Sequence, residues 1–313
     1  MIWIPLLLFF ISCIFLVGSG GYLVKLLIKI SRYLRLSEFV VAFIIMAFST
    51  SIPELFVGIN SAIKGNPALS LGNVIGSNIA DLTLIIGIAA LLGKGIKVKN
   101  PFIRKDSLFM LLIAILPIGL MFLGKSLSRI DGIILVSVFL IYMWHLSKER
   151  KELKNQFKDD HNQNHLIITF ILFALCLAVL FISSHFVVKY ATDLALELLL
   201  PPILIGLFFV AIGTSLPELV FEIKSVLAKR GDFAVGDAMG SVVCNSSLVL
   251  GVTAIIYPIT SNFLLFITSA IFMILVSILF LFFIRGKKGL SVTKSIILII
   301  LYLLFIMFEY LIK

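Results

Sequence analysis

The chain has 313 residues, of which 61% are hydrophobic and only 13% are charged, and its mean hydropathy is +1.18. A water-soluble protein of this length could not bury that much apolar surface, so the composition excludes one. The formal net charge of +10 could indicate nucleic-acid binding, but basic loops between membrane spans explain it better. We therefore expect an integral membrane protein with no nucleic-acid partner.

Ten apolar segments follow one another along the chain, separated by short polar or basic connectors. The first lacks a basic region and a small-residue cleavage site, and it predicts a retained helix rather than a signal peptide. The most polar connector, residues 145 to 165, separates the ten into two groups of five. The expected spans cover about 3–24, 38–63, 70–93, 107–124, 130–146, 166–188, 201–227, 234–258, 262–284 and 293–311.

Basic residues are unevenly shared between the two sides that ten spans would create. Of the 26 Lys and Arg residues, twenty lie on the side of the central connector and five on the other, and Lys224 lies within a span. Such an excess marks the cytoplasmic side. We therefore expect a multi-pass protein of the cell membrane with both termini extracellular and the central linker cytoplasmic.

The two halves are also related in sequence. A shift of 164 residues places "AFSTSIPEL" (47–55) on "AIGTSLPEL" (211–219) and, without a gap, "GNVIGSNIADLTLIIG" (72–87) on "GDAMGSVVCNSSLVLG" (236–251). With five spans in each half, such a repeat is inverted, which is typical of transporters. We predict an all-α polytopic membrane protein of ten transmembrane helices in two inverted five-helix repeats: 1–145 with motif 47–87, the linker 146–165, and 166–313 with motif 211–251.

Each repeat has a proline followed by a glutamate near the middle of a span. A carboxylate there costs roughly 2.5–3.5 kcal/mol on insertion scales, and this chain carries two, Glu54 and Glu218. Each proline frees a backbone carbonyl near Thr50 or Thr214. Broken backbone at that depth is tolerated only where it lines an enclosed cavity. We predict that both glutamates converge on one such pocket.

The second motif of each repeat supplies a facing wall. Ser77 and Asp81 are four residues apart and share one helix face, as do Ser241 and Asn245. No cluster of histidines or cysteines competes with these oxygen donors, so we expect Ca²⁺ or Na⁺ rather than a transition metal, and no disulfide framework. Helix packing explains the small residues of these motifs as well as ion binding does: Gly72, Gly76, Ser77, Gly236, Gly240 and Ser241.

Two further acids lie beside these motifs. Glu222 has no counterpart, because Gly58 takes its place in the first repeat. We expect it to reach the cytoplasmic mouth or to pair with Lys224 or Lys229, with a role in transport as the alternative. Asp237 could assist ion access or cap a helix N-terminus. The sequence leaves both of these readings of Asp237 open.

At these residues the sequence resembles the sodium/calcium exchanger family of the cation/calcium antiporter superfamily, in its prokaryotic type. "STSIPE…GNVIGSN" and "GTSLPE…GDAMGS" look like the two alpha-repeats of that family. The resemblance implies antiport of Ca²⁺ against Na⁺ by alternating access, with the first and sixth helices sliding across a rigid core. It implies neither an enzymatic activity nor a cofactor, and no obligate protein partner is evident. The ligands implied are Glu54 and Glu218 for Ca²⁺ and Na⁺; Ala47, Thr50, Ser51, Ala211, Thr214 and Ser215 to complete these sites; Ser77 and Ser241 for Na⁺; and Asp81 and Asn245 as an acid/amide pair.

Two changes, at three positions, depart from the family pattern. Exchangers of this branch typically carry the amide in the first repeat and the acid in the second, whereas here Asp81 comes first and Asn245 second. Ser49 replaces a usual glycine. Both changes affect the coupling ion, so H⁺-coupled or K⁺-dependent exchange stays open beside Na⁺. A passive cation channel and an intramembrane enzyme are the competing classes; the inverted repeat favours a transporter, and no catalytic pair motif is present.

Overall fold

The apolar runs of the sequence fold as helices, because in hydrocarbon a segment must satisfy its own backbone polar groups. The structure is a computed structural model that describes residues 3–33, 47–98, 101–149, 163–199, 201–261, 263–286 and 289–312. With π-helical segments written as η, its elements are α1 (Trp3–Tyr33), α2 (Ala47–Thr50), α3 (Ile52–Ile63), α4 (Pro67–Ala80), η2 (Asp81–Ile85), α5 (Ile86–Leu92), α6 (Pro101–Gly124), α7 (Arg129–Glu149), α8 (Gln163–Glu197), α9 (Pro202–Ile205), η4 (Gly206–Val210), α10 (Ala211–Thr214), α11 (Leu216–Leu227), α12 (Gly231–Val243), η5 (Cys244–Val249), α13 (Leu250–Ile256), α14 (Phe263–Arg285) and α15 (Val292–Ile312).

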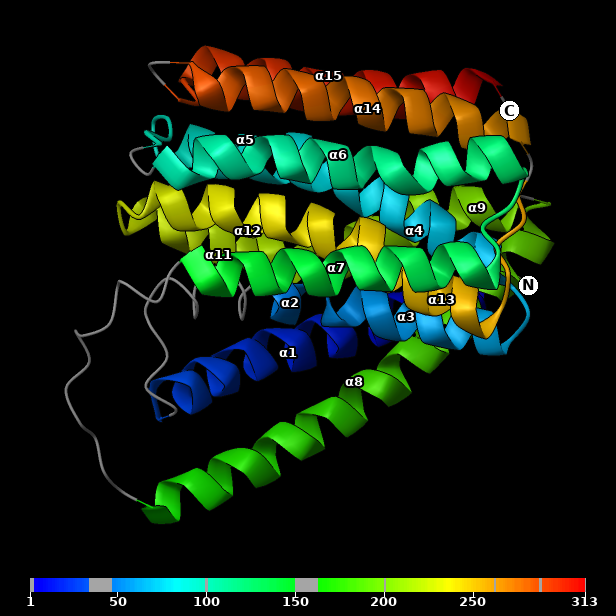
Figure 1. Cartoon of the computed structure of the whole chain (residues 1–313). Coiled ribbons are helices and arrows are strands. Elements are labelled where there is room, and N and C mark those ends of the chain that lie inside the picture. The colour runs from blue at the N-terminus through cyan, green and yellow to red at the C-terminus, as the bar shows by residue number, and fades with distance from the viewer. Residues whose placement is uncertain are drawn as a thin grey trace.

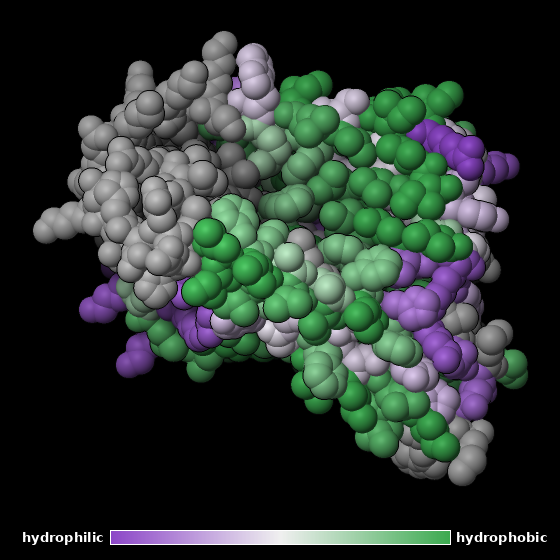
Figure 2. All heavy atoms as spheres, turned by 90° about the horizontal axis from the view of Figure 1, so that it is seen from below, coloured by the Kyte–Doolittle hydropathy of each residue, from purple (hydrophilic) through white to green (hydrophobic). Residues whose placement is uncertain are grey.

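Seven helices of the described residues are long and apolar enough to cross a membrane, and one bent pair, Pro202–Thr214 with Leu216–Leu227, makes an eighth. Ile4–Leu16 and Ile52–Ile63 are shorter apolar helices. On the face shown in Figure 2, hydrophobic residues cover the middle and hydrophilic residues lie toward the edges. An all-helical, multi-pass membrane protein is thus confirmed.

Two helices are longer than the apolar segments that predicted them. α1 continues to Tyr33 instead of ending near residue 24, and α8 covers Gln163–Glu197 instead of 166–188. Lysine, leucine and glutamate are good helix formers, and no proline follows the apolar run in either helix. The helix therefore continues after the hydropathy signal has ended.

Helices extend into both ends of the predicted linker, residues 146–165. α7 runs to Glu149 and α8 begins at Gln163, so both helices enter the range 146–165. Residues 150–162 of that linker lie outside the described residues, as does the predicted beginning of the second span near residue 38.

The helices lie roughly side by side in layers (Figure 1). α14 and α15 form one outer layer, α4 and α12 lie in the interior, and α1 and α8 pack on each other at the opposite side. The N- and C-terminal ends of the described chain lie at the same end of the bundle (Figure 1).

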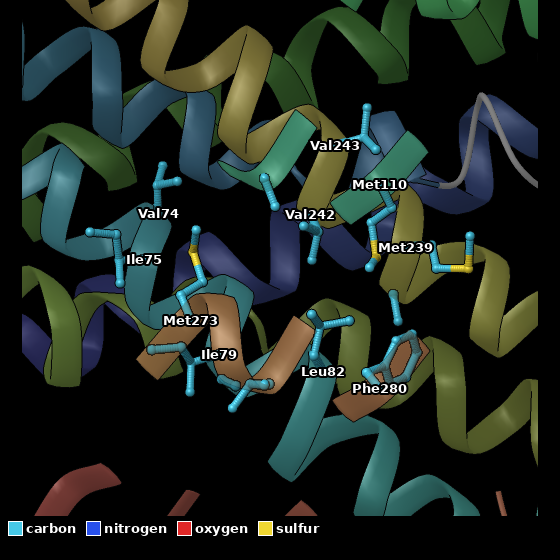
Figure 3. Close-up of a cluster of buried hydrophobic side chains, with 14 of the residues drawn as sticks. Val74, Ile75, Ile79, Leu82, Met110, Met239, Val242, Val243, Met273 and Phe280 are labelled. Atoms are coloured by element: carbon cyan, nitrogen blue, oxygen red, sulfur yellow. The ribbon is translucent and has the colours of Figure 1, made fainter. Parts of the chain in front are cut away.

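The hydrophobic core forms on one side of α4 and α12. Figure 3 shows side chains of both helices meeting residues from α6 and α14. This side of α4 and of α12 packs against apolar side chains of α6 and α14. The polar residues Ser77 of α4 and Ser241 of α12 instead contact the broken helices. The labelled core residues are Val74, Ile75, Ile79, Leu82, Met110, Met239, Val242, Val243, Met273 and Phe280.

The same irregularities occur in both halves. α2 and α3 are separated at Ser51, with φ −81° and ψ 2°, and α10 and α11 at Ser215, with φ −85° and ψ 7°. In each case a proline, Pro53 or Pro217, follows within the first turn, where its missing N–H is tolerated. The second break bends the chain by 42°. The prediction that the proline motif interrupts its helix is confirmed in both halves.

Two isolated β-bridges repeat the relationship outside the motifs. Ile96 pairs with Leu290, and Leu127 pairs with Ile259, both antiparallel. A shift of 163 residues carries Ile96 onto Ile259 and Leu127 onto Leu290, so each bridge maps onto the other. The connectors of the two halves are therefore joined in equivalent ways.

Candidate functional site

The breaks in the two proline helices and the interior helices bring polar side chains together in the core. Glu54 and Glu218 lie in the first turn after the breaks, while the facing residues come from α4 with η2 and from α12 with η5. Side chains at most 1% exposed include Thr50, Ser51, Glu54, Ser77, Asp81, Ala211, Thr214, Ser215, Glu218, Ser241 and Asn245. The remaining predicted site residue, Ala47, is the first residue of α2.

Hydroxyl groups join the two halves across this cluster. The Thr50 and Ser241 hydroxyl oxygens are 3.2 Å apart, and those of Ser77 and Thr214 are 3.4 Å apart. The shift of 164 residues that relates the motifs carries the first pair onto the second. Each broken helix therefore faces the interior helix of the other half, and one cluster is built from both.

The carboxylates of this cluster have few protein partners. Ser77 donates to Glu54 Oε1 at 3.5 Å, but Glu54 Oε2 and both oxygens of Glu218 and of Asp81 have no hydrogen-bond partner among the described residues. Glu54 and Asp81 both act electrostatically on Glu218, so the three acids share one region. Buried charges are normally paired or bound to a metal. This arrangement therefore suits a bound cation.

The carboxylates alone do not form a metal site. Among the described residues, no group of three or more His, Cys, Asp and Glu side chains is placed to hold a metal ion. Hydroxyl and carbonyl oxygens would have to complete the coordination, as they do for Ca²⁺ and Na⁺. The Ala211 carbonyl lies at the site, where it accepts from the Thr214 hydroxyl at 3.3 Å and from the Ser215 N–H at 3.0 Å.

Asp81 and Asn245 differ in how they are held. Asp81 begins η2, and Asn245 is the second residue of η5, so both lie where the helix widens to a π-turn, a feature common at functional sites. The Asn245 amide donates to Asn78 Oδ1 at 3.2 Å, whereas the Asp81 carboxylate lies near the Ser215 hydroxyl without a hydrogen bond. The acid is thus the less restrained of the two.

Two asparagines at the site were not predicted. Asn73 accepts from the Thr214 hydroxyl at 3.1 Å, just as Asp237 accepts from Thr50 at 3.4 Å in the other half. Asn78 donates to Ser246 at 2.8 Å and so connects α4 to the π-helical segment η5. The 164-residue shift aligns Asn73 with Asp237 and could have identified it, but Asn78 aligns with a valine and gave no such signal.

Two predictions are wrong: that Glu222 reaches the cytoplasmic mouth or pairs with a lysine, and that Asp237 caps a helix N-terminus. Glu222 is fully buried and neither of its oxygens has a hydrogen-bond partner, while Lys224 and Lys229 are both exposed. Asp237 does not cap a helix, because α12 begins at Gly231 and Asp237 is in its second turn. Leu219 to Leu227 continues as regular helix, so the Glu222 side chain follows the face of Glu218 inward instead of reaching a lysine.

Two glycines allow the interior helix α4 to approach α9 and η4. A Cβ on Gly72 would clash with the Ile203 carbonyl, and one on Gly76 with the Leu207 carbonyl. Small residues at four-residue spacing permit such backbone contact between membrane helices. The packing role foreseen for these two glycines is therefore present, and it fixes α4 against the second broken helix.

The fold and this cluster define a multi-pass membrane protein with a buried, acidic, oxygen-rich core. The chain belongs to the sodium/calcium exchanger protein family, whose model matches residues 4–148 and 168–311. It is similar to the sodium/calcium exchanger MaX1 of Methanosarcina acetivorans (29% identity, 98% of each chain) and to the putative antiporter CaxA of Alkalimonas amylolytica (32%, 79% of each). Its fold matches the sodium-calcium exchanger NCX_Mj soaked with Na⁺ and Sr²⁺ (25% identity, TM-score 0.70, 98% of each chain). Exchange of cations, with Ca²⁺ among them, is the activity that this membership supports.

Proposed function

We propose that the protein is a secondary active antiporter that exchanges Ca²⁺ for Na⁺ across the cell membrane by alternating access, and that it is not an enzyme. The observation that carries the proposal is a set of five buried carboxylate oxygens, Glu54 Oε2 and both of Glu218 and of Asp81, that have no hydrogen-bond partner in the part of the chain that the structure describes. One Ca²⁺ or several Na⁺ ions would each neutralise these acids, and two such ways of filling one site make the ions compete. That competition is the physical basis of antiport.

In the proposed site, Glu54 and Glu218 bind Ca²⁺ and are shared with Na⁺. Their burial at the breaks of two helices, among hydroxyl and carbonyl oxygens from both halves, supports this assignment. The other proposed ligands are the carbonyls or hydroxyls of Ala47, Thr50, Ser51, Ala211, Thr214 and Ser215, the hydroxyls of Ser77 and Ser241, and the side chains of Asp81 and Asn245.

The proposed topology has ten spans in two inverted repeats, residues 1–145 and 166–313, with a cytoplasmic linker and extracellular termini. The matching helix breaks and β-bridges of the two halves support the repeat. The two ends of the described chain, at Trp3 and Ile312, lie at one end of the bundle, which agrees with an even number of spans (Figure 1). The pair of α1 and α8, packed mainly on each other, would be the part that slides across the remaining helices.

Flux measurements with single ion gradients test this function. In proteoliposomes containing the full chain, Ca²⁺ uptake should require an outward Na⁺ gradient and should saturate with Ca²⁺. Uptake that instead follows a pH gradient or needs K⁺ would assign the coupling to those ions. Currents that need no gradient of a second ion would identify a channel and contradict antiport.

Asp81→Asn is expected to alter the dependence of exchange on Na⁺ or pH more than the KM for Ca²⁺. Asp81 carries no hydrogen bond, and its position departs from the family pattern, so its charge should matter most for the coupling ion. The measurement is Ca²⁺ uptake against Na⁺ concentration at several pH values. The exchange variant Asp81→Asn with Asn245→Asp, which keeps the charge of the cluster, is the matched control. An equal loss of Ca²⁺ affinity and of Na⁺ dependence would contradict this role.

A further inference from the structure

Glu222 and Asp237 lie at the same level on two neighbouring helices. α11 and α12 pack along each other and are joined by residues 228–230. Glu222 precedes Lys229 by seven residues and Asp237 follows it by eight, so the two acids are similarly far from the connection. Each is four residues, or about 6 Å of helix, closer to that connection than Glu218 and Ser241 are.

Among the residues that the structure describes, no cationic group is paired with either acid. Both side chains are 0% exposed, and Glu222 Oε1, Glu222 Oε2 and Asp237 Oδ2 have no hydrogen-bond partner. Asp237 Oδ1 accepts from the Thr50 hydroxyl at 3.4 Å. Asp237 is the charged residue that acts most strongly on Glu222, followed by Asp81. Two carboxylates that interact across the packed helices α11 and α12, with unused oxygens and no lysine partner in the described part of the chain, require a cation if both are to stay charged.

The first half has no equivalent of the pair. Gly58 is at the position of Glu222, and a Cβ there would lie 2.6 Å from Thr253 Oγ1 and 3.0 Å from Ser70 Oγ, so that position is closely packed. Asn73 is at the position of Asp237 and is neutral. The acids therefore extend the central cluster toward one end of the bundle only, the end of the α11–α12 connection.

We propose that Glu222, Asp237 and the Thr50 hydroxyl form a second cation site, which binds Ca²⁺ between the central cluster and the α11–α12 end. Two carboxylates and a hydroxyl supply the hard, anionic oxygens that Ca²⁺ prefers. In transport, this site would load Ca²⁺ from one side of the membrane, and that role rests on the proposed antiport function. The binding itself does not depend on exchange.

Equilibrium binding of ⁴⁵Ca²⁺ to the purified full chain in detergent tests the site. In the Glu54→Gln background, which weakens the central cluster, we expect Ca²⁺ binding to persist. Adding Glu222→Gln and Asp237→Asn should weaken that remaining binding by about 10- to 100-fold, because each removes a charge-assisted ligand. Glu309→Gln is the matched control, since Glu309 is also buried in the bundle but accepts from Ser269 at 2.7 Å.

Unchanged Ca²⁺ binding on adding Glu222→Gln and Asp237→Asn would overturn the second site, and so would proton uptake by the pair without any Ca²⁺ binding. If the combined variant does not fold, either single substitution in the wild-type background should still lower the affinity of one Ca²⁺. Wild-type binding and transport by Glu54→Gln would instead refute the central site, so the two failures are distinguishable.

A sided transport assay tests the loading role. With Ca²⁺ supplied at the α11–α12 end, Glu222→Gln should raise the KM for Ca²⁺ by roughly tenfold, while the KM at the opposite face stays within about twofold of wild type. An equal rise at both faces would contradict a site open to one side only.

Discussion

Glu54→Gln and Glu218→Gln are each expected to reduce Na⁺-driven Ca²⁺ uptake to about one hundredth of the wild-type rate or less. Removing one partner from a buried, paired charge costs about 3–5 kcal/mol, and every 1.4 kcal/mol is a factor of ten in affinity. Both carboxylates are fully buried, and within the described ranges three of their four oxygens lack a hydrogen-bond partner, so little else could compensate for the lost ligand. The measurement is the initial rate of ⁴⁵Ca²⁺ uptake by proteoliposomes.

Glu309→Gln again serves as the matched control, because it removes a buried charge of α15 that hydrogen-bonds to Ser269 outside the cluster. It should retain most of the wild-type rate. Full uptake by Glu54→Gln or by Glu218→Gln, at normal expression, would remove the carboxylates from the proposed site.

Gly72→Ala is expected to destabilise the protein substantially. The new Cβ would clash with the Ile203 carbonyl, and since this neighbour is backbone, α4 and α9 would have to separate. Overpacking of this kind costs about 1–3 kcal/mol, which for a chain of this size corresponds to a fall in Tm on the order of 2–5 °C. Thermal loss of the monodisperse peak in size-exclusion chromatography measures it.

Gly119→Ala provides the comparison for that substitution. Gly119 is also inside a membrane helix, α6, but nothing lies within 4 Å of a Cβ built on it. Alanine favours helix over glycine by about 1 kcal/mol, so this variant should be at least as stable as the wild type. Equal Tm values for the two variants would show that α4 does not depend on backbone contact at Gly72.

Much of the fold follows from the sequence because its signals are local. Hydropathy located the apolar helices, and the Pro-Glu motifs located the breaks at Ser51 and Ser215. The predicted helix ends were less accurate, because α1 and α8 extend beyond their apolar runs. Hydropathy detects only the part of a helix that crosses the hydrocarbon core, whereas the polar residues that follow also favour helix. The π-turns were not predicted, since a one-residue widening leaves no mark in composition.

The gathering of the motif side chains was predictable from the duplicated motifs, whereas the surroundings of Glu222, which has no counterpart, were not. Thr50, Thr214, Ser77 and Ser241 were recognised from the duplicated motifs, and they form the hydroxyl pairs between the halves. Glu222 has no counterpart, so its nearest lysines in the sequence suggested an ion pair. The helix instead turns the glutamate toward α12 and the lysines outward, which only the packing of α11 on α12 reveals.

The hydroxyl pairs that cross between the halves also bear on how the chain is assembled. Because Thr50 meets Ser241 and Ser77 meets Thr214, the polar atoms of each half acquire these partners only once the other half is in place. During synthesis the first half of the chain would therefore hold its acids and hydroxyls without those partners until the second half emerges. A chain divided within 150–162 should accordingly yield stable protein when both pieces are co-expressed, and degraded pieces when either is made alone.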